Sequence, residues 1–234
     1  MPAYAELQVT TNFCFLRGAS HPEELVVQAQ ALGLAGIAVT DRNSLAGIVR
    51  AHQQALQLEF RFLVGCRLDL VDGTSLLCWP TDRPAYARLS SLLTLGKRRA
   101  AKAGCSLTLE DVLAHEEGQV FALIPPEAPD DGFAELARTL RRRRQLYLVL
   151  SHRYAGDDAR RLKELAELAR DTGLRPLATN DVHYHHPDRR PLQDVVTCIR
   201  EHARIADAAP LLFPNAERHL KPPEEMARLF RDCP

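Results

Sequence analysis

The stretch Gly36–Asn43 reads GIAVTDRN and decides the fold, because a short apolar run is followed at once by polar side chains. An apolar run of this length is typical of a buried strand. The same order recurs in LYLVLSHRY at 146–154 and in RPLATNDVH at 175–183. In barrels of parallel strands, the residues that directly follow the strands lie at the C-terminal face, where active sites are assembled. The three segments therefore predict one functional face at the ends of several strands.

Helical patterns lie between the apolar runs. Pro22–Leu34 has proline in its first turn, two glutamates near its start and Gly33 near its end, which are the usual start and stop signals of a helix. A long helical pattern over Asp157–Thr172 stops at Gly173. Further helices are expected up to Ala55 and over 84–95, 109–115 (capped by Thr108) and 133–143.

The remaining apolar runs predict strands. Residues 67–71 and 75–79 predict a hairpin around Asp72-Gly73. Single strands are expected over 5–9, 60–64 and 119–124. A strand is followed by a helix at least five times along the chain, and this order predicts an α/β fold built on a mainly parallel sheet or barrel.

The composition narrows the class of protein. With 234 residues, the chain is long enough for one large α/β domain or two small ones. Lys+Arg and Asp+Glu balance at 30 each, whereas a protein that binds nucleic acid by its own charge usually has a basic excess. The basic runs Lys97–Arg99 and Arg141–Arg144 are interpreted first as solvated helix faces, with phosphate contacts as the alternative.

The cysteines and the apolar segments indicate a cytoplasmic protein. The six cysteines include no C-x-x-C pair, so they are interpreted as reduced thiols, most of them in the core. The N-terminus has no signal-peptide pattern, and no apolar run approaches the roughly 18–20 residues of a membrane span. We therefore expect no membrane partner.

The segment Asn180–His183 carries the strongest chemical signal. Asp181 and His183 are two apart on an extended segment, so their side chains point the same way and a carboxylate and an imidazole could reach one divalent metal. A hydrogen-bonded pair at a strand end is the alternative interpretation. His152 and Asp41-Arg42 also follow strands, and each has an equally simple structural explanation. Phosphate-binding glycine loops, G-x-S-x-G and H-E-x-x-H are absent from the sequence.

Several segments together resemble a known family. AELQVTTNFCFLRGASHPEELV, GIAVTDRNSLAGIVRA, LLTLGKRRAAKAGCSLTLEDVL, SHRY and PLATNDVHYHHP occur in this order. They resemble the PHP (polymerase and histidinol phosphatase) domain at the N-terminus of bacterial C-family DNA polymerases. FLRGASHPEEL and LTLGKRRA are most similar to the error-prone, damage-tolerance branch. The resemblance covers essentially the whole chain.

The resemblance implies a fold and a domain layout. The family fold is a distorted (β/α)7 barrel of seven parallel strands, with a metal cluster at the C-terminal ends of the strands. Residues 1–190 would form this barrel. Residues 191–234 would form a helical extension leading toward the polymerase region, which lies beyond Pro234.

The resemblance also implies that most of the metal site is replaced. The family's H-x-H motif falls on Gln8 and Thr10, and its T-D-H motif has become Thr40-Asp41-Arg42. Further ligand positions fall at about Arg17 and Arg67, and the ligand expected near strand 119–124 has no His or Cys. The ligands that remain are His152, Asp181 and His183.

These replacements change the charge of the site. Arginine is always protonated and cannot ligate a metal, so it adds repulsion where a cation would bind. We therefore expect no catalytic residue and no metal, or at most one weak zinc or manganese ion at His152, Asp181 and His183. We also expect Arg42 or Arg67 to pair with Asp181 in place of the metal.

The implied function is structural. The chain would be the PHP domain of an error-prone DNA-directed DNA polymerase (a nucleotidyltransferase) that acts in replication across damage and in DNA repair. It would pack against the thumb and palm and would meet DNA only through the polymerase. Two alternatives remain open: a metal-dependent phosphoesterase or proofreading 3′–5′ exonuclease, and a free-standing protein-interaction module.

Overall fold

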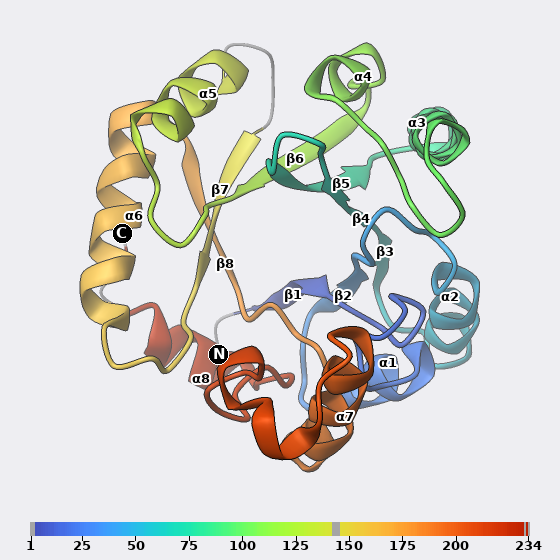
Figure 1. Ribbon diagram of the computed structural model, residues 1–234, viewed down its shortest axis with the longest axis vertical. Helices are drawn as coiled ribbons and strands as arrows, with labels where there is room; N and C mark the ends of the chain where they lie inside the picture. Colours follow the sequence, from blue (N-terminus) through green and yellow to red (C-terminus); the bar gives the residue numbers. More distant parts are fainter. Residues whose placement is uncertain (1–2, 142–145, 232, 234) are drawn as a thin grey trace.

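The computed structural model describes residues 3–141, 146–231 and 233, and their strands form two open sheets (Figure 1). The first sheet has three parallel strands, β1 (Ala5–Val9), β2 (Gly36–Val39) and β3 (Phe62–Val64). The second is mixed and has the order β4 (Cys66–Asp69), β5 (Ser75–Pro80), β6 (Gln119–Ile124), β7 (Leu146–Ser151) and β8 (Arg175–Thr179). Each strand predicted from an apolar run is present, within one or two residues at its ends.

The expected barrel of seven parallel strands is not confirmed. The pairs β4–β5 and β5–β6 are antiparallel, and only β6–β7 and β7–β8 are parallel in the second sheet. The reversal comes from the predicted hairpin, since Gly73 at its turn has φ +90°, a left-handed conformation that glycine adopts without steric cost. Two sets of backbone hydrogen bonds join the sheets: Thr10 N to Val182 O (2.8 Å), and Arg67 N to Asp41 O (3.1 Å).

The helices lie around the outside of the strands (Figure 1). They are α1 (Pro22–Ala31), α2 (Ile48–Gln57), α3 (Arg83–Arg99), α4 (Leu109–Ala114), α5 (Asp131–Arg141), α6 (Asp158–Thr172), α7 (Arg190–Arg200) and α8 (Pro223–Leu229). Among the described residues, no helix is both long and apolar enough to cross a membrane.

The ends of the helices follow local signals. The Thr108 side chain accepts a hydrogen bond from Asp111 N at the start of α4, as predicted, and Gly173 ends α6 with φ +69°. Helix α3 runs four residues beyond the predicted end, through its basic run, because cationic side chains stabilise the last turn of a helix. Arg142–Arg144 of the second basic run lie outside the described residues.

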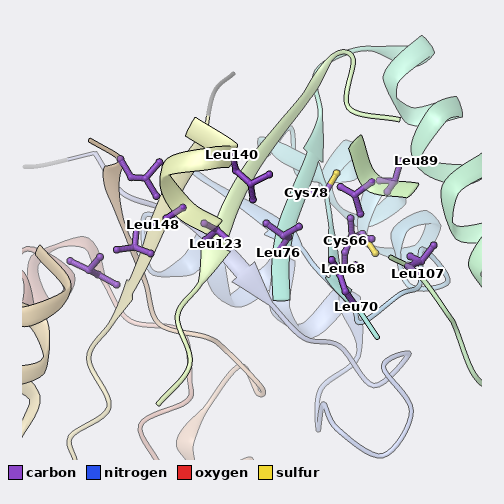
Figure 2. Close-up of a cluster of buried hydrophobic side chains, with 14 of the residues drawn as sticks. Cys66, Leu68, Leu70, Leu76, Cys78, Leu89, Leu107, Leu123, Leu140 and Leu148 are labelled. Atoms are coloured by element: carbon purple, nitrogen blue, oxygen red, sulfur yellow. The ribbon is translucent and has the colours of Figure 1, made fainter. Parts of the chain in front are cut away.

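The largest core lies between the second sheet and helices α3, α5 and α6 (Figure 2). Strands β4 to β7 contribute the leucines and cysteines of the sheet face, namely Cys66, Leu68, Leu76, Cys78, Leu123 and Leu148. A second cluster packs α1 and α2 against the three-stranded sheet. All six cysteines are free, and four of them are buried, as the sequence predicted.

Candidate functional site

The candidate site is centred on Asp181, two residues after the end of β8. Its Oδ1 accepts a hydrogen bond from Gln8 Nε2 (2.8 Å), and its Oδ2 accepts one from Arg218 Nη1 (2.8 Å). Gln8 lies on β1 and in turn accepts a hydrogen bond from Thr179 Oγ1 (2.8 Å) through its Oε1. One carboxylate therefore connects two strand ends with the C-terminal tail.

Arginine sets the charge state of Asp181. Burial raises the pKa of this carboxyl, but the Arg218 guanidinium and His183 lower it more, so its pKa lies well below the ordinary value. The pKa of His183 is lowered, whereas an ion pair normally raises the pKa of a histidine. Burial lowers the pKa of His183 more than Asp181, 3.7 Å from its Nε2, raises it. The site therefore holds an ionised carboxylate paired with a guanidinium, beside a neutral histidine.

Arg42 and Arg67 do not pair with Asp181, so that prediction is wrong. Arg42 Nη1 lies 2.8 Å from Asp69 Oδ2, and Arg67 Nε lies 2.7 Å from Asp69 Oδ1. Asp69 is two residues after Arg67 on β4, and side chains at that spacing point to the same face of a strand. A backbone bridge between Arg42 and Arg67 brings the second guanidinium to the same carboxylate. Asp69 therefore binds both arginines, and Arg218, near the C-terminus, is the partner of Asp181.

His152 directly follows β7, and its side chain turns toward Asp158 at the start of α6 rather than toward Asp181. Its Nδ1 is 3.7 Å from Asp158 Oδ1, and its ring packs against Tyr154 with centroids 4.5 Å apart. Asp158 also accepts hydrogen bonds from the amides of Arg153 (2.6 Å) and Ala155 (2.8 Å). These contacts organise the turn that leads into α6. They agree with the structural explanation that the sequence left open for His152.

Two other positions where the resemblance implied metal ligands, Thr10 and Arg17, make structural contacts. Thr10 is buried, and its amide bonds Val182 O. The carbonyl of Arg17 lies 3.4 Å from His183 Nδ1. Burial and the neighbouring charges of Arg42 and Arg200 lower the pKa of the Arg17 guanidinium. Arginine side chains thus gather around the face where the resemblance implied a metal cluster.

The donor set does not fit a divalent metal cluster. Among the described residues, no three or more His, Cys, Asp or Glu side chains come close enough together to hold an ion. Both oxygens of Asp181 already accept hydrogen bonds, one of them from a guanidinium that cannot ligate. The cavity beside it, lined in part by Gln8, Ser151 and Arg218, has a volume of about 30 Å³. Small-molecule sites usually have ~300–1,000 Å³.

Two buried carboxyl groups belong to the segments that build the site; the sequence made Asp41 a candidate, because it follows a strand, but did not single out Glu6. Glu6 accepts hydrogen bonds from Tyr4 Oη (2.8 Å), Gln8 N (2.9 Å) and Asn180 N (3.0 Å), and burial raises its pKa to about 7. Asp41 accepts hydrogen bonds from the amide and hydroxyl of Thr11, both at 2.7 Å, and burial raises its pKa to about 7. The alternation of Glu6 and Gln8 on one face of β1 was the available signal for the first of them.

Arg218 was also missed, and the sequence offered no comparable signal for it. It lies in a tail segment whose carbonyl accepts the amide of His183 (2.8 Å), and its guanidinium stacks over Phe213 at 5.1 Å. Asn180 fixes the same segment by donating to the carbonyls of Glu217 (2.9 Å) and His219 (2.6 Å). The segment that contains Arg218 therefore forms one side of the site.

Comparisons with known proteins agree on the family. The model of the PHP domain family matches residues 6–170. An error-prone DNA polymerase of Caulobacter vibrioides is 55% identical over the whole of this chain, which covers 22% of that protein. An error-prone DNA polymerase of Brucella abortus is 48% identical over the same extent, and error-prone DNA polymerase 2 of Agrobacterium fabrum is 50% identical over 97% of this chain. The chain matches the N-terminal part of these relatives and spans about a fifth of their length.

Solved structures show the same fold at low sequence identity. A protein from Bifidobacterium adolescentis, named a putative metal-dependent phosphoesterase, superposes with a TM-score of 0.57 at 18% identity, over 78% of this chain and 88% of that one. An amidohydrolase from Chromobacterium violaceum, solved with bound sulfate and no metal, gives 0.59 at 16% identity with the same two coverages. At these identities the likeness concerns the fold alone.

Proposed function

Because this chain belongs to the PHP domain family, we propose that it is the structural N-terminal domain of an error-prone DNA polymerase, with a strand-end site that does not catalyse hydrolysis. The observation that carries the proposal is the pairing of Asp181 with Arg218 and Gln8. The guanidinium of Arg218 and the amide of Gln8 already bind the carboxylate oxygens that a metal ion would need as ligands.

The charge around Asp181 supports the non-catalytic part of the proposal. Hydrolysis of a phosphoester by a metal cluster requires ligands that concentrate negative charge, so that the ions bind and activate water. In this chain, Gln8 and Thr10 are neutral, and Arg42, Arg67 and Arg218 are cationic. A divalent ion would have to displace a formed ion pair and would meet like charges nearby.

The proposal extends to the fold and its surroundings. The two sheets, joined by hydrogen bonds at β1–β8 and β2–β4, would together form the distorted (β/α)7 barrel over residues 1–190. Residues 191–234 would lead toward the rest of the polymerase, whose thumb and palm we propose as partners. DNA would be contacted through those domains, and the protein would act in the cytoplasm, in replication across damage and in DNA repair.

The test combines metal content with activity. The purified chain is exposed to zinc, manganese and magnesium, exchanged into metal-free buffer, and analysed by mass spectrometry. We expect less than about a tenth of an equivalent of any ion, and no hydrolysis of a chromogenic phosphate ester or of a 3′-labelled DNA strand. One tight equivalent that is lost in Asp181→Asn, together with either hydrolytic activity, would replace the proposal with the phosphoesterase or exonuclease alternative.

The polymerase part of the proposal has a separate test. Translation of the gene past Pro234 is expected to give a protein that extends a primer on a damaged template. A protein of 234 residues made as such in cells, with no polymerase attached, would instead favour the free-standing interaction module.

A further inference from the structure

Helix α7 presents its apolar side chains to the outside. Leu192, Val195 and Ile199 are 43%, 47% and 54% exposed. Their spacing of three and four residues places them in one stripe along the helix. The helix lies at the periphery of the molecule, on the side away from α3 and α4 (Figure 1). A surface helix of a globular protein normally turns such a stripe toward the core.

The inward face of α7 is mostly polar instead, with Cys198 as its buried apolar residue. Gln193 and Thr197 are buried, and Gln193 Nε2 donates to Thr197 Oγ1 (2.9 Å). Arg190 pairs with Asp194 (2.7 Å) and donates to the carbonyl of Phe213. These contacts fix the rotation of the helix about its axis. Since burial of apolar surface is worth ~25 cal/mol per Å², this orientation forgoes a stabilisation that the opposite rotation would gain.

The apolar stripe continues onto neighbouring segments. Arg200 Nη1 donates to Leu16 O (2.9 Å) and holds the loop that follows β1 against the end of α7. Phe15 of this loop is 81% exposed, and Ile205, just after α7, is 57% exposed. Phe15, Ile205 and the three α7 residues are named the α7 patch below. Exposed apolar side chains gathered on one helix face and on the segments beside it indicate an interaction site more than a single exposed residue does.

We infer that the α7 patch is the docking surface for the polypeptide that follows Pro234 in the longer polymerase, an inference that rests on the proposed function. The relatives match this chain along its whole length, and the chain spans only about a fifth of theirs. A segment on the same polypeptide docks at high effective concentration, so a patch of modest size suffices. A second copy of the chain would have to bury about 800 Å² per partner without that advantage.

Cysteine labelling tests the inference directly. The Val195→Cys variant is prepared as the 234-residue chain and as the same chain extended through the rest of its reading frame. The rate of maleimide attachment to the peptide that contains residue 195 is then compared between the two proteins. Val71→Cys is the matched control, because Val71 is 62% exposed on the β4–β5 hairpin, where its amide bonds Leu107 O (3.0 Å) on the α3 side. We expect labelling at 195 to slow at least tenfold in the extended chain and labelling at 71 to change less than twofold.

Two other results would overturn the inference. Equal labelling at 195 in an extended chain that polymerises DNA would reject the docking surface and leave the proposed function standing. Protection at 195 in the short chain alone, increasing with protein concentration and with a dimer in light scattering, would assign the patch to a second copy. An extended chain without polymerase activity would reject the proposed function, which separates the two failures.

Discussion

Arg218 binds Asp181 across 37 positions of the sequence, at 2.8 Å between Nη1 and Oδ2. The guanidinium is 13% exposed and the carboxylate 21% exposed, so the pair is largely removed from water. A pair of this kind is costly to break on one side, because the remaining charge stays desolvated. The ion pair at the candidate site therefore contributes to the stability of the fold.

Asp181→Asn is expected to lower the free energy of unfolding by about 2–3 kcal/mol in buffer that contains a metal chelator, since Arg218 and Gln8 lose their anionic acceptor. Urea unfolding measures the change. Asp171→Asn, at an exposed position of α6, is the control and should stay within about 0.5 kcal/mol. Unfolding of the Asp181 variant at the wild-type urea concentration would contradict the role of the ion pair.

Arg218→Ala is expected to create metal binding where the wild-type chain has none. Removal of the guanidinium frees Oδ2 of Asp181, whose Oδ1 still accepts from Gln8. The imidazole of His183, with Nε2 3.7 Å from Asp181, lies beside it, and a carboxylate with an imidazole is a zinc-type donor pair. Zinc should raise the melting temperature of this variant and not that of the wild type. Arg204→Ala serves as the control, because Arg204 is 87% exposed. The interpretation fails if zinc leaves all three proteins unchanged.

Asp41→Asn is expected to alter how stability depends on pH. The folded-state pKa of Asp41 is raised to about 7 by burial, from an ordinary value of 3.8. The folded protein therefore binds this proton more tightly than the unfolded chain, and the free energy of unfolding falls as pH rises from about 4 to about 7. Asparagine carries no titrating proton and can still bond the amide and hydroxyl of Thr11, so this loss disappears.

The measurement is the difference in unfolding free energy between the wild type and the Asp41 variant, taken at several pH values. The pKa values of His183, His185 and His219 are lowered, with burial as the largest cause, and their effect on stability runs in the opposite direction. These histidines are present in both proteins, so their contribution cancels. A difference that stays constant between pH 4 and 7 would show that Asp41 does not hold its proton.

Gly65→Ala is expected to destabilise the junction between the two sheets by about 1–3 kcal/mol. A Cβ at this position would lie 2.8 Å from both Thr40 Cγ2 and Trp79 Cδ1, which are buried and cannot move freely. Gly132→Ala is the matched control in helix α5, where the nearest atom is 3.4 Å away and alanine favours the helix. Thermal unfolding should shift down in the first variant and stay level or rise in the second.

Local signals account for the parts of the fold that the sequence predicted. The hairpin at Asp72-Gly73, the cap at Thr108 and the stop at Gly173 each depend on residues within a few positions. Such features need no knowledge of distant partners. The nearness of Asp181 and His183 was predicted for an extended segment, but Asp181 has φ +46°, so a left-handed turn of the backbone, rather than strand alternation, accompanies their separation of 3.7 Å.

Distant partners decided what the sequence missed. The tail delivers Arg218 to Asp181, Asp69 binds Arg42 and Arg67, and His152 turns to Asp158. In a chain with many arginines, each guanidinium is chemically an equal candidate for one carboxylate. The choice depends on which side chain the folded backbone brings within hydrogen-bond reach. The sequence by itself therefore determined the family and the order of strands and helices. Only the tertiary structure decided which arginine neutralises Asp181 and which face of α7 points outward, because long-range packing fixes those positions.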